Sequence, residues 1–149
     1  MKIILFPFSR KLSEDKPHPK SPDLAWWRHL VKLLEDQGHE LIQVGVTGED
    51  KLLKDVRFNL PIAELSKLIL EADTFVGIDS MGQHLAWDLG KRGIVIWGQS
   101  DPIIFGHPEH VNLLKDRKYL REKQFWLWTQ TTFQPEAFVT PEEVIKHLK

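Results

Sequence analysis

Cysteine is absent from the 149-residue sequence, which excludes disulfide bonds, thiolate catalysis and cysteine-based zinc sites. Its absence fits a reducing compartment, so we expect a cytoplasmic protein. No run of about 18 apolar residues occurs, so no membrane span is expected. The apolar run Ile3–Phe6 is too short for a signal peptide and is followed at once by Pro7 and Arg10. We therefore expect this run to form a first strand.

An excess of charge of either sign is also missing, because the net charge is only −1. A broad surface for nucleic acid is therefore not expected, although a local basic pocket is compatible with this balance. The sequence lacks the dinucleotide-binding glycine motif, the P-loop and the G-x-S-x-G elbow of hydrolases. His107 and His110 flank Pro108 and Glu109 without a third ligand at suitable spacing. We therefore predict neither a metal site nor a cofactor.

What the sequence does contain is an alternation of apolar runs and amphipathic segments. Continuous apolar runs are typical of strands that are buried on both faces of a parallel sheet. Such runs lie at 3–6, 41–46, 74–78 and 94–97, with a possible edge strand at 111–114. Helices are predicted between them, beginning at the N-cap pattern Ser21-Pro22-Asp23, at Pro61, at Ser80 with Gln83 as a capping box, and at Thr140. This order predicts an α/β protein with a single Rossmann-like, three-layer domain at 1–149 and a mostly parallel sheet.

Ligands of open parallel sheets bind at the carboxyl ends of the strands. Four polar segments follow predicted strands, at 9–21, 47–50, 79–84 and 98–106. The third is the most informative, because a strand that runs directly into a helix presents free N–H groups and a positive dipole to an anion. Gly82 would let a ligand approach the backbone, and His84 is placed to reach the same ligand. The alternative is that Asp79 and Ser80 only cap the helix.

The first of these segments is basic and includes Arg10, Lys16, His18 and Lys20. Such a cluster can neutralise a diphosphate, although a solvated surface loop has the same composition. Glu49 follows the second strand, where an acidic residue often binds ribose hydroxyls. The alternative for Glu49 is an exposed loop acid.

The stretch from Ala72 to Ala86 resembles the Asp-Ser/Thr-Gly-x-x-His-Leu signature of the heptosyltransferase-like glycosyltransferases, family 9, of GT-B type. The next strand and Gly98, Ser100, Asp101 and Pro102 are similar to the continuation of that family, and the resemblance covers roughly residues 1–115. It implies the carboxyl-terminal, nucleotide-sugar-binding half of a GT-B fold and a metal-independent glycosyltransferase. One departure is that Met81 stands where the family usually has glycine.

The resemblance also implies roles for individual residues. Ser9 and one of Lys16 or Lys20 would contact the diphosphate, Glu49 would hold the ribose, and Leu60 or Ile62 would pack near the base. The sugar-phosphate would be surrounded by Asp79, Ser80, Met81, Gly82 and His84, with His84 and Asp79 as the candidate catalytic residues and Gly98 in the same site.

Two functions remain open. One is transfer of a sugar from a nucleotide-diphosphate sugar to an unknown acceptor. The other is a non-catalytic nucleotide- or phosphate-binding module or partner subunit, since GT-B enzymes have a second, acceptor-binding domain that 149 residues cannot include. Segment 117–138 is rich in aromatic residues, including Phe125, Trp126, Trp128 and Phe133. It is interpreted as the cover of one sheet edge, or as a sugar platform or self-association surface. From it we predict a homo-oligomer or a partner chain that supplies the acceptor site.

Overall fold

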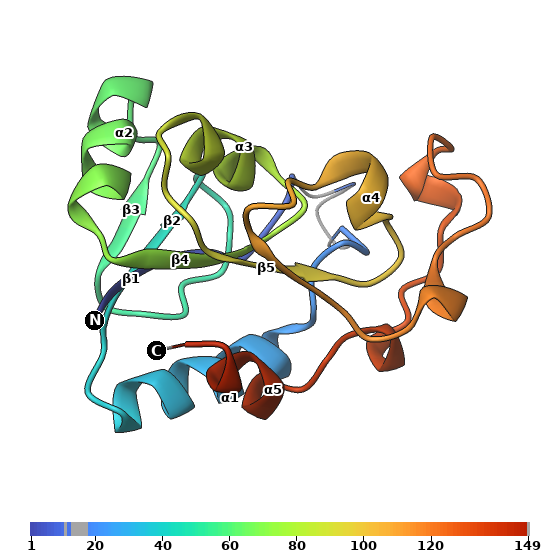
Figure 1. Ribbon diagram of the computed structural model, residues 1–149, viewed down its shortest axis with the longest axis horizontal. Coiled ribbons are helices and arrows are strands. Elements are labelled where there is room, and N and C mark those ends of the chain that lie inside the picture. Colours follow the sequence, from blue (N-terminus) through green and yellow to red (C-terminus); the bar gives the residue numbers. More distant parts are fainter. Residues whose placement is uncertain (11, 13–17, 149) are drawn as a thin grey trace.

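The strands of the computed structural model, which describes residues 1–10, 12 and 18–148, form one sheet (Figure 1). They are β1 (Lys2–Phe6), β2 (Glu40–Gly45), β3 (Val56–Phe58), β4 (Thr74–Ile78), β5 (Ile94–Trp97) and β6 (Val111–Leu114). Their order in the sheet is β3-β2-β1-β4-β5-β6, and every neighbouring pair is parallel. The predicted α/β fold is confirmed, with β6 at an edge as expected.

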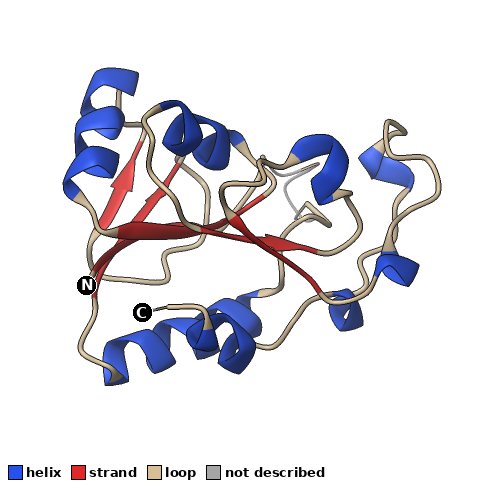
Figure 2. Cartoon of the chain, in the orientation of Figure 1, coloured by secondary structure: helices blue, strands red, loops and turns tan. Residues whose placement is uncertain are grey.

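Helices cover both faces of this sheet (Figures 1 and 2). One face carries α1 (Leu24–Asp36) and α5 (Pro141–Lys146), and the other carries α2 (Ile62–Glu71) and α3 (Met81–Asp88); α4 (Pro102–Phe105) follows β5. Because side chains alternate along a strand, Ile3 and Leu5 pack with the core on the α1 face. Ile4 and Phe6 pack with the core on the α2 face. The three-layer prediction is therefore confirmed.

The start of α1 differs from the sequence prediction. Asp23, not Ser21, is the N-cap, and its Oδ1 accepts a hydrogen bond from the backbone N of Trp26 at 2.9 Å. The Ser21 hydroxyl instead donates to the carbonyl of Pro7 at 2.6 Å and accepts from Trp27 Nε1 at 3.1 Å. Ser21 is buried. Its hydroxyl, which the local pattern predicted to cap the helix, makes a tertiary contact instead.

The capping box predicted for α3 is also wrong. Ser80 occupies the N-cap position with an extended backbone, but its side chain caps no N–H. Gln83 turns its Nε2 toward Asp79 Oδ1, at 3.2 Å. The first N–H groups of α3 therefore have no side-chain cap from Ser80.

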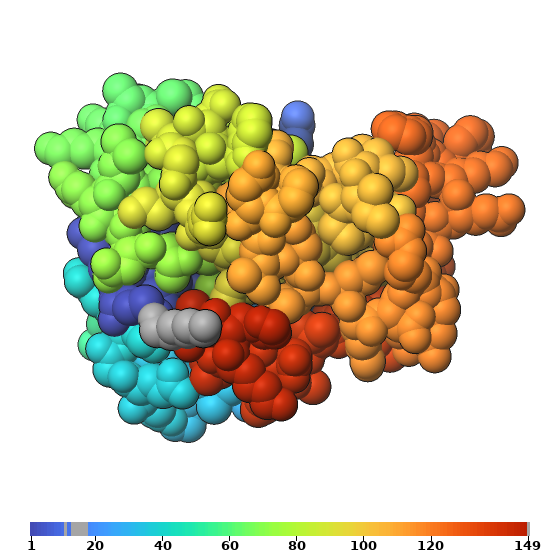
Figure 3. All heavy atoms as spheres, viewed as in Figure 1, coloured from blue at the N-terminus to red at the C-terminus, as the bar shows by residue number. Residues whose placement is uncertain are grey.

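The segment after β6 forms three short 3₁₀ turns, Arg117–Tyr119, Trp128–Gln130 and Pro135–Ala137. Its polar side chains bind the exit of β5, where Gln124 Nε2 donates to the carbonyl of Gln99 at 2.9 Å. Phe138 ends the segment in the core, whereas the part around Phe125 projects from one side of the molecule (Figure 3). Among the described residues, no helix combines the length and apolarity needed to cross a membrane.

The strand order reverses between β1 and β4, because β2 and β3 extend the sheet in one direction and β5 and β6 in the other. Crevices for ligands form at such a switch point, outside the carboxyl ends of the strands. The fold therefore directs the search for a site to the residues that follow β1 and β4.

Candidate functional site

A cleft of about 650 Å³ opens at this switch point, within the range of roughly 300–1,000 Å³ that is usual for small-molecule sites. We call it the central cleft. It is lined by the last residues of β1 and β2, by residues that follow β1, β2, β3 and β4, and by one residue of α2. They are Phe6, Phe8, Ser9, Arg10, Lys20, Val44, Gly45, Val46, Glu49, Asn59, Leu60, Leu65, Asp79, Ser80, Met81 and Gly82.

The amino end of α3 forms one wall of the central cleft, through Ser80, Met81 and Gly82. Its uncapped N–H groups and the positive end of its dipole favour a bound anion. A side chain at Gly82 would place its Cβ 2.5 Å from the ring Cγ of Phe6. Glycine is therefore required here by the packing of α3 on β1, a reason that the sequence pattern did not suggest.

Lys20 brings a positive charge to the same wall. Its Nζ lies 3.5 Å from Asp79 Oδ2, and both side chains are mostly buried. Asp79 also accepts the hydrogen bond from Gln83, so the carboxylate is held from two sides. A phosphate in the central cleft would meet a lysine that is already positioned by its partner.

The exits of β2 and β3 form the opposite wall. Glu49 Oε1 accepts a hydrogen bond from the backbone N of Val46 at 2.9 Å, and Gly45 provides the space for this carboxylate because a Cβ there would collide with it. Asn59, which has a positive φ of 59°, donates to Thr47 Oγ1 at 2.6 Å. These bonds fix Glu49 at the cleft, where a carboxylate can accept hydrogen bonds from hydroxyl groups.

His84 points elsewhere. Its Nδ1 lies 2.8 Å from Nε2 of His107, whose ring stacks on Trp87. Burial, followed by the neighbouring His107, lowers the pKa of His84, while Asp79 acts in the opposite direction. His84 is thus directed toward His107 and is not among the residues that line the central cleft.

The structure brings together most of the residues predicted from the sequence, but not all. Within the cleft lie Ser9, Lys20, Glu49, Leu60, Asp79, Ser80, Met81 and Gly82. Ile62 is 60% exposed on α2, and the space beside Gly98 is filled by the ring of Phe138. Neither of them, nor His84, lines the cleft, and Lys16 lies outside the described residues.

One residue of the lining was missed, and one contact of Lys20 was not expected. Asn59 was not singled out, although asparagine is among the residues that most readily adopt the left-handed conformation. Trp128 lies 5.5 Å from Lys20 Nζ, and no local pattern in segment 117–138 indicates this contact. Within the described part of the chain, no group of three or more His, Asp or Glu side chains is arranged to hold a metal.

Comparisons with known proteins agree with this fold. The family model described as glycosyltransferase family 9 (heptosyltransferase) matches residues 2–124. Escherichia coli heptosyltransferase WaaC, solved with ADP, superposes with a TM-score of 0.70 at 15% identity over 97% of this chain. Escherichia coli ADP-heptose LPS heptosyltransferase II gives 0.68 at 16% over 97%. The family 9 glycosyltransferase of Veillonella parvula gives 0.68 at 14% over 97%. No curated protein matches.

This chain spans 42–44% of the length of those three structures. At these identities the superpositions show the fold alone, that of one half of a GT-B protein. The family match extends over most of the sequence and includes Asp79, Ser80 and Glu49. The chain therefore belongs to glycosyltransferase family 9, the heptosyltransferase family.

Proposed function

We propose that this protein binds a nucleotide-diphosphate sugar in the central cleft and takes part in transfer of the sugar to an acceptor. The observation that carries the proposal is the convergence of Lys20 and the uncapped amino end of α3 on one wall of the cleft, facing Glu49. Two cationic features suit a diphosphate, and a fixed carboxylate suits ribose hydroxyls.

In this proposal the chemistry is electrostatic. As the bond from the anomeric carbon to the diphosphate breaks, negative charge grows on the departing oxygens. Lys20 and the α3 dipole would stabilise that charge without a metal. The acceptor would be presented by a second domain, a partner chain or another copy of this chain, and a cytoplasmic location, which the lack of cysteine fits, is part of the same proposal.

A second candidate is a module that binds the nucleotide sugar without turning it over. One observation favours it: His84, a candidate catalytic residue, is bonded to His107 outside the cleft. The carboxylates within the cleft, Asp79 and Glu49, are both held by hydrogen bonds. Neither is presented as an uncommitted base.

The test is calorimetric titration with ADP, the nucleotide solved with WaaC, followed by other nucleoside diphosphates. We expect saturable binding that weakens as salt is raised, because charge pairing contributes. Absence of binding for every nucleoside diphosphate at millimolar concentration would overturn both candidates.

Turnover of the nucleotide sugar separates the transferase from the binding module. Release of nucleoside diphosphate from a panel of nucleotide sugars, with and without sugar acceptors, would support the transferase. Donor binding with no release under any acceptor would instead support the binding module.

A further inference from the structure

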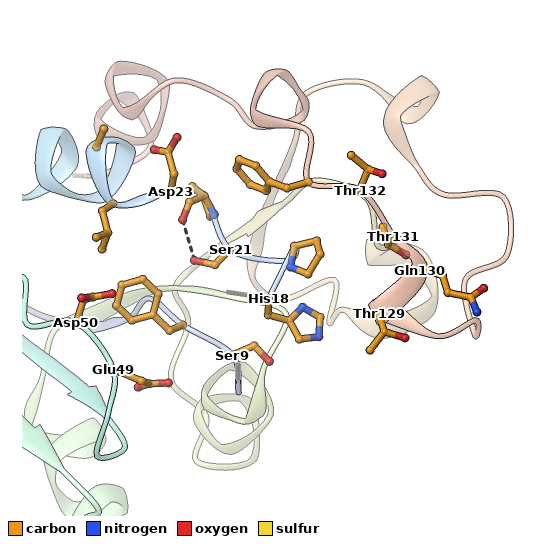
Figure 4. A pocket seen from close by; sticks show the side chains of 16 residues that line it. Ser9, His18, Ser21, Asp23, Glu49, Asp50, Thr129, Gln130, Thr131 and Thr132 are labelled. Atoms are coloured by element: carbon orange, nitrogen blue, oxygen red, sulfur yellow. Dashed lines mark hydrogen bonds between the residues drawn. The ribbon is translucent and has the colours of Figure 1, made fainter. Parts of the chain in front are cut away.

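A second cavity of about 850 Å³ lies beside the central cleft, next to the amino end of α1 (Figure 4). We call it the α1-side cavity. It shares Phe8, Ser9 and Glu49 with the central cleft. Its other walls come from the segment before α1, the exit of β2 and residues 129–133. Apart from the shared residues, its described lining has no part in the proposed donor site.

Two aromatic rings line this cavity, and both are held from behind by core rings. Phe8 packs edge-on against Trp27, with ring centroids 6.5 Å apart, and Trp27 is fully buried. Phe133 stacks on Phe138 at 5.9 Å and 30°. Because their supports are buried, these rings present fixed apolar faces to the cavity, and a ligand need not order them on binding.

The wall at 129–132 is held by hydrogen bonds to the rest of the fold. Arg121 Nη1 donates to Thr131 Oγ1 at 3.0 Å, and Gln99 Nε2 donates to the carbonyl of Thr132 at 2.9 Å. Arg121 also lies over the ring of Trp128, 3.5 Å from its centroid. These contacts hold residues 129–132 in place, so this wall of the cavity is rigid.

Whereas basic and acidic side chains balance in the lining of the central cleft, the described lining of the α1-side cavity is acidic. Asp23, Glu49 and Asp50 line it, together with threonines, and no lysine or arginine is among the described residues of its lining. Figure 4 shows Glu49 and Asp50 on one side and the threonines across from them. Burial lowers the pKa of His18 to about 4, so His18 adds no positive charge at neutral pH. An anionic ligand is therefore disfavoured here.

We propose that the α1-side cavity is a second ligand site that binds an uncharged glycoside, with an apolar ring face against Phe8 and Phe133. Aromatic faces pack against the C–H surfaces of a sugar or an aryl group. Carboxylate and hydroxyl oxygens along the walls accept and exchange hydrogen bonds with sugar hydroxyls. The site goes beyond the donor site and does not depend on it, although the shared Ser9 and Glu49 place the two ligands side by side.

The experiment uses para-nitrophenyl glucoside as the ligand and para-nitrophenyl phosphate as its anionic counterpart. Each is followed by saturation-transfer NMR on the whole chain in the presence of excess inorganic pyrophosphate, which competes for the phosphate-binding wall of the central cleft. We expect saturable transfer to the glucoside and at least about tenfold weaker binding of the phosphate, equivalent to 1.4 kcal/mol. Equal binding of the two, or no saturable binding of the glucoside, would overturn the proposal.

A matched pair of variants locates the binding. Ala25 and Ala63 are both exposed and both the second residue of a helix, but only Ala25 lines a cavity. Ala25→Trp should reduce glucoside binding at least about tenfold, whereas Ala63→Trp should leave it unchanged. Glucoside binding that survives Ala25→Trp would place the ligand elsewhere and refute the site.

ADP titration of the same variants keeps this proposal separate from the donor proposal. Ala25→Trp should bind ADP as the unaltered chain does, because Ala25 does not line the central cleft. If ADP fails to bind any of these proteins while the glucoside still binds, the donor proposal falls and the second site stands. The reverse result would remove the second site alone.

Discussion

Lys20 connects two parts of the chain that are far apart in sequence. Its Nζ lies 3.5 Å from Asp79 Oδ2 at the switch point and 5.5 Å from the centroid of the Trp128 ring. It is four-fifths buried, so its charge is weakly screened by solvent. A lysine in this position interacts strongly with an anion that enters the central cleft.

We therefore predict that Lys20→Ala weakens ADP binding by about 1–3 kcal/mol, the usual range for a hydrogen bond to a charged group. Calorimetric titration measures the loss. Lys32→Ala is the matched control, because Lys32 is exposed on α1 and pairs only locally with Asp36. Equal affinity of Lys20→Ala and Lys32→Ala would remove Lys20 from the phosphate site.

The titration of His18 is strongly altered by its surroundings. It is 8% exposed, its Nδ1 accepts a hydrogen bond from the backbone N of Lys20, and its ring packs on Trp128 at 4.9 Å. Burial, then Lys20 and Arg121, lowers its pKa from 6.5 to about 4. The folded state therefore keeps His18 neutral over a range where the unfolded chain binds a proton.

Because the pKa of His18 is lower in the folded state than in the unfolded chain, the stability of the fold decreases at acidic pH. Stability is fully retained above pH 6.5 and is lost as pH falls toward about 4, by up to roughly 3 kcal/mol from this group. In His18→Asn, which keeps an acceptor near Nδ1, we expect the free energy of unfolding to fall less over this range. Urea unfolding at several pH values measures both slopes, and identical slopes would contradict the prediction.

At the scale of elements, the contact between α3 and β1 determines the shape of the central cleft. Gly82 is buried in the first turn of α3, and an added Cβ would lie 2.5–2.8 Å from three ring carbons of Phe6. Alanine is favoured over glycine in a helix by about 1 kcal/mol. Overpacking costs about 1–3 kcal/mol, so the steric cost of the added Cβ should outweigh the gain in helix propensity.

Gly82→Ala should accordingly destabilise the protein, by a net loss on the order of 1 kcal/mol in urea unfolding. The same substitution in a Phe6→Leu background should cost less, because the ring that it meets is gone. A stabilising Gly82→Ala, or an equal cost in both backgrounds, would show that Phe6 can move away and that the contact does not fix α3.

The elements that the sequence predicted well are those whose signal is local. The apolar runs at Ile3–Phe6 and Ile94–Trp97 are strands because both faces of the sheet bury them. Such local signals do not cover residues whose bonds are set by distant partners. Ser21 binds Pro7 instead of capping α1, and His84 binds His107 instead of facing the cleft. Spacing within a motif cannot indicate such partners.

The contrast between local signals and distant contacts also explains which residues of the candidate site could be predicted from the sequence. The polar segments that follow β1, β2 and β4 meet because parallel strands end at one edge, so Ser9, Glu49 and Asp79 could be placed together from the sequence. Gly98 follows a strand in the same way, yet Phe138 covers it. That ring comes from segment 117–138, whose path no periodic pattern describes.

At the scale of the whole molecule, exposed apolar side chains gather on α4 and on the segment around Phe125, which projects from one side of the molecule (Figure 3). Phe125 is 82% exposed and Ile103 79%, and the ring of Phe125 contacts Phe105 of α4 at 5.3 Å. Trp126 and Leu127 are also exposed. Trp128, expected from the sequence to share this surface, is instead half-buried beneath Arg121. A continuous apolar patch on a soluble protein usually marks an interface.

We predict that this patch associates with a second copy of the chain, so that sedimentation velocity shows a concentration-dependent oligomer. Phe125→Glu should shift the protein toward monomer, because a charge in the middle of the interface would be desolvated without a partner. Ile62→Glu is the control: Ile62 is also an exposed apolar residue, at 60%, but it lies on α2, away from the patch. If both variants behave alike, general surface apolarity rather than this patch drives association. If the unaltered chain stays monomeric at every concentration, the homo-oligomer is refuted.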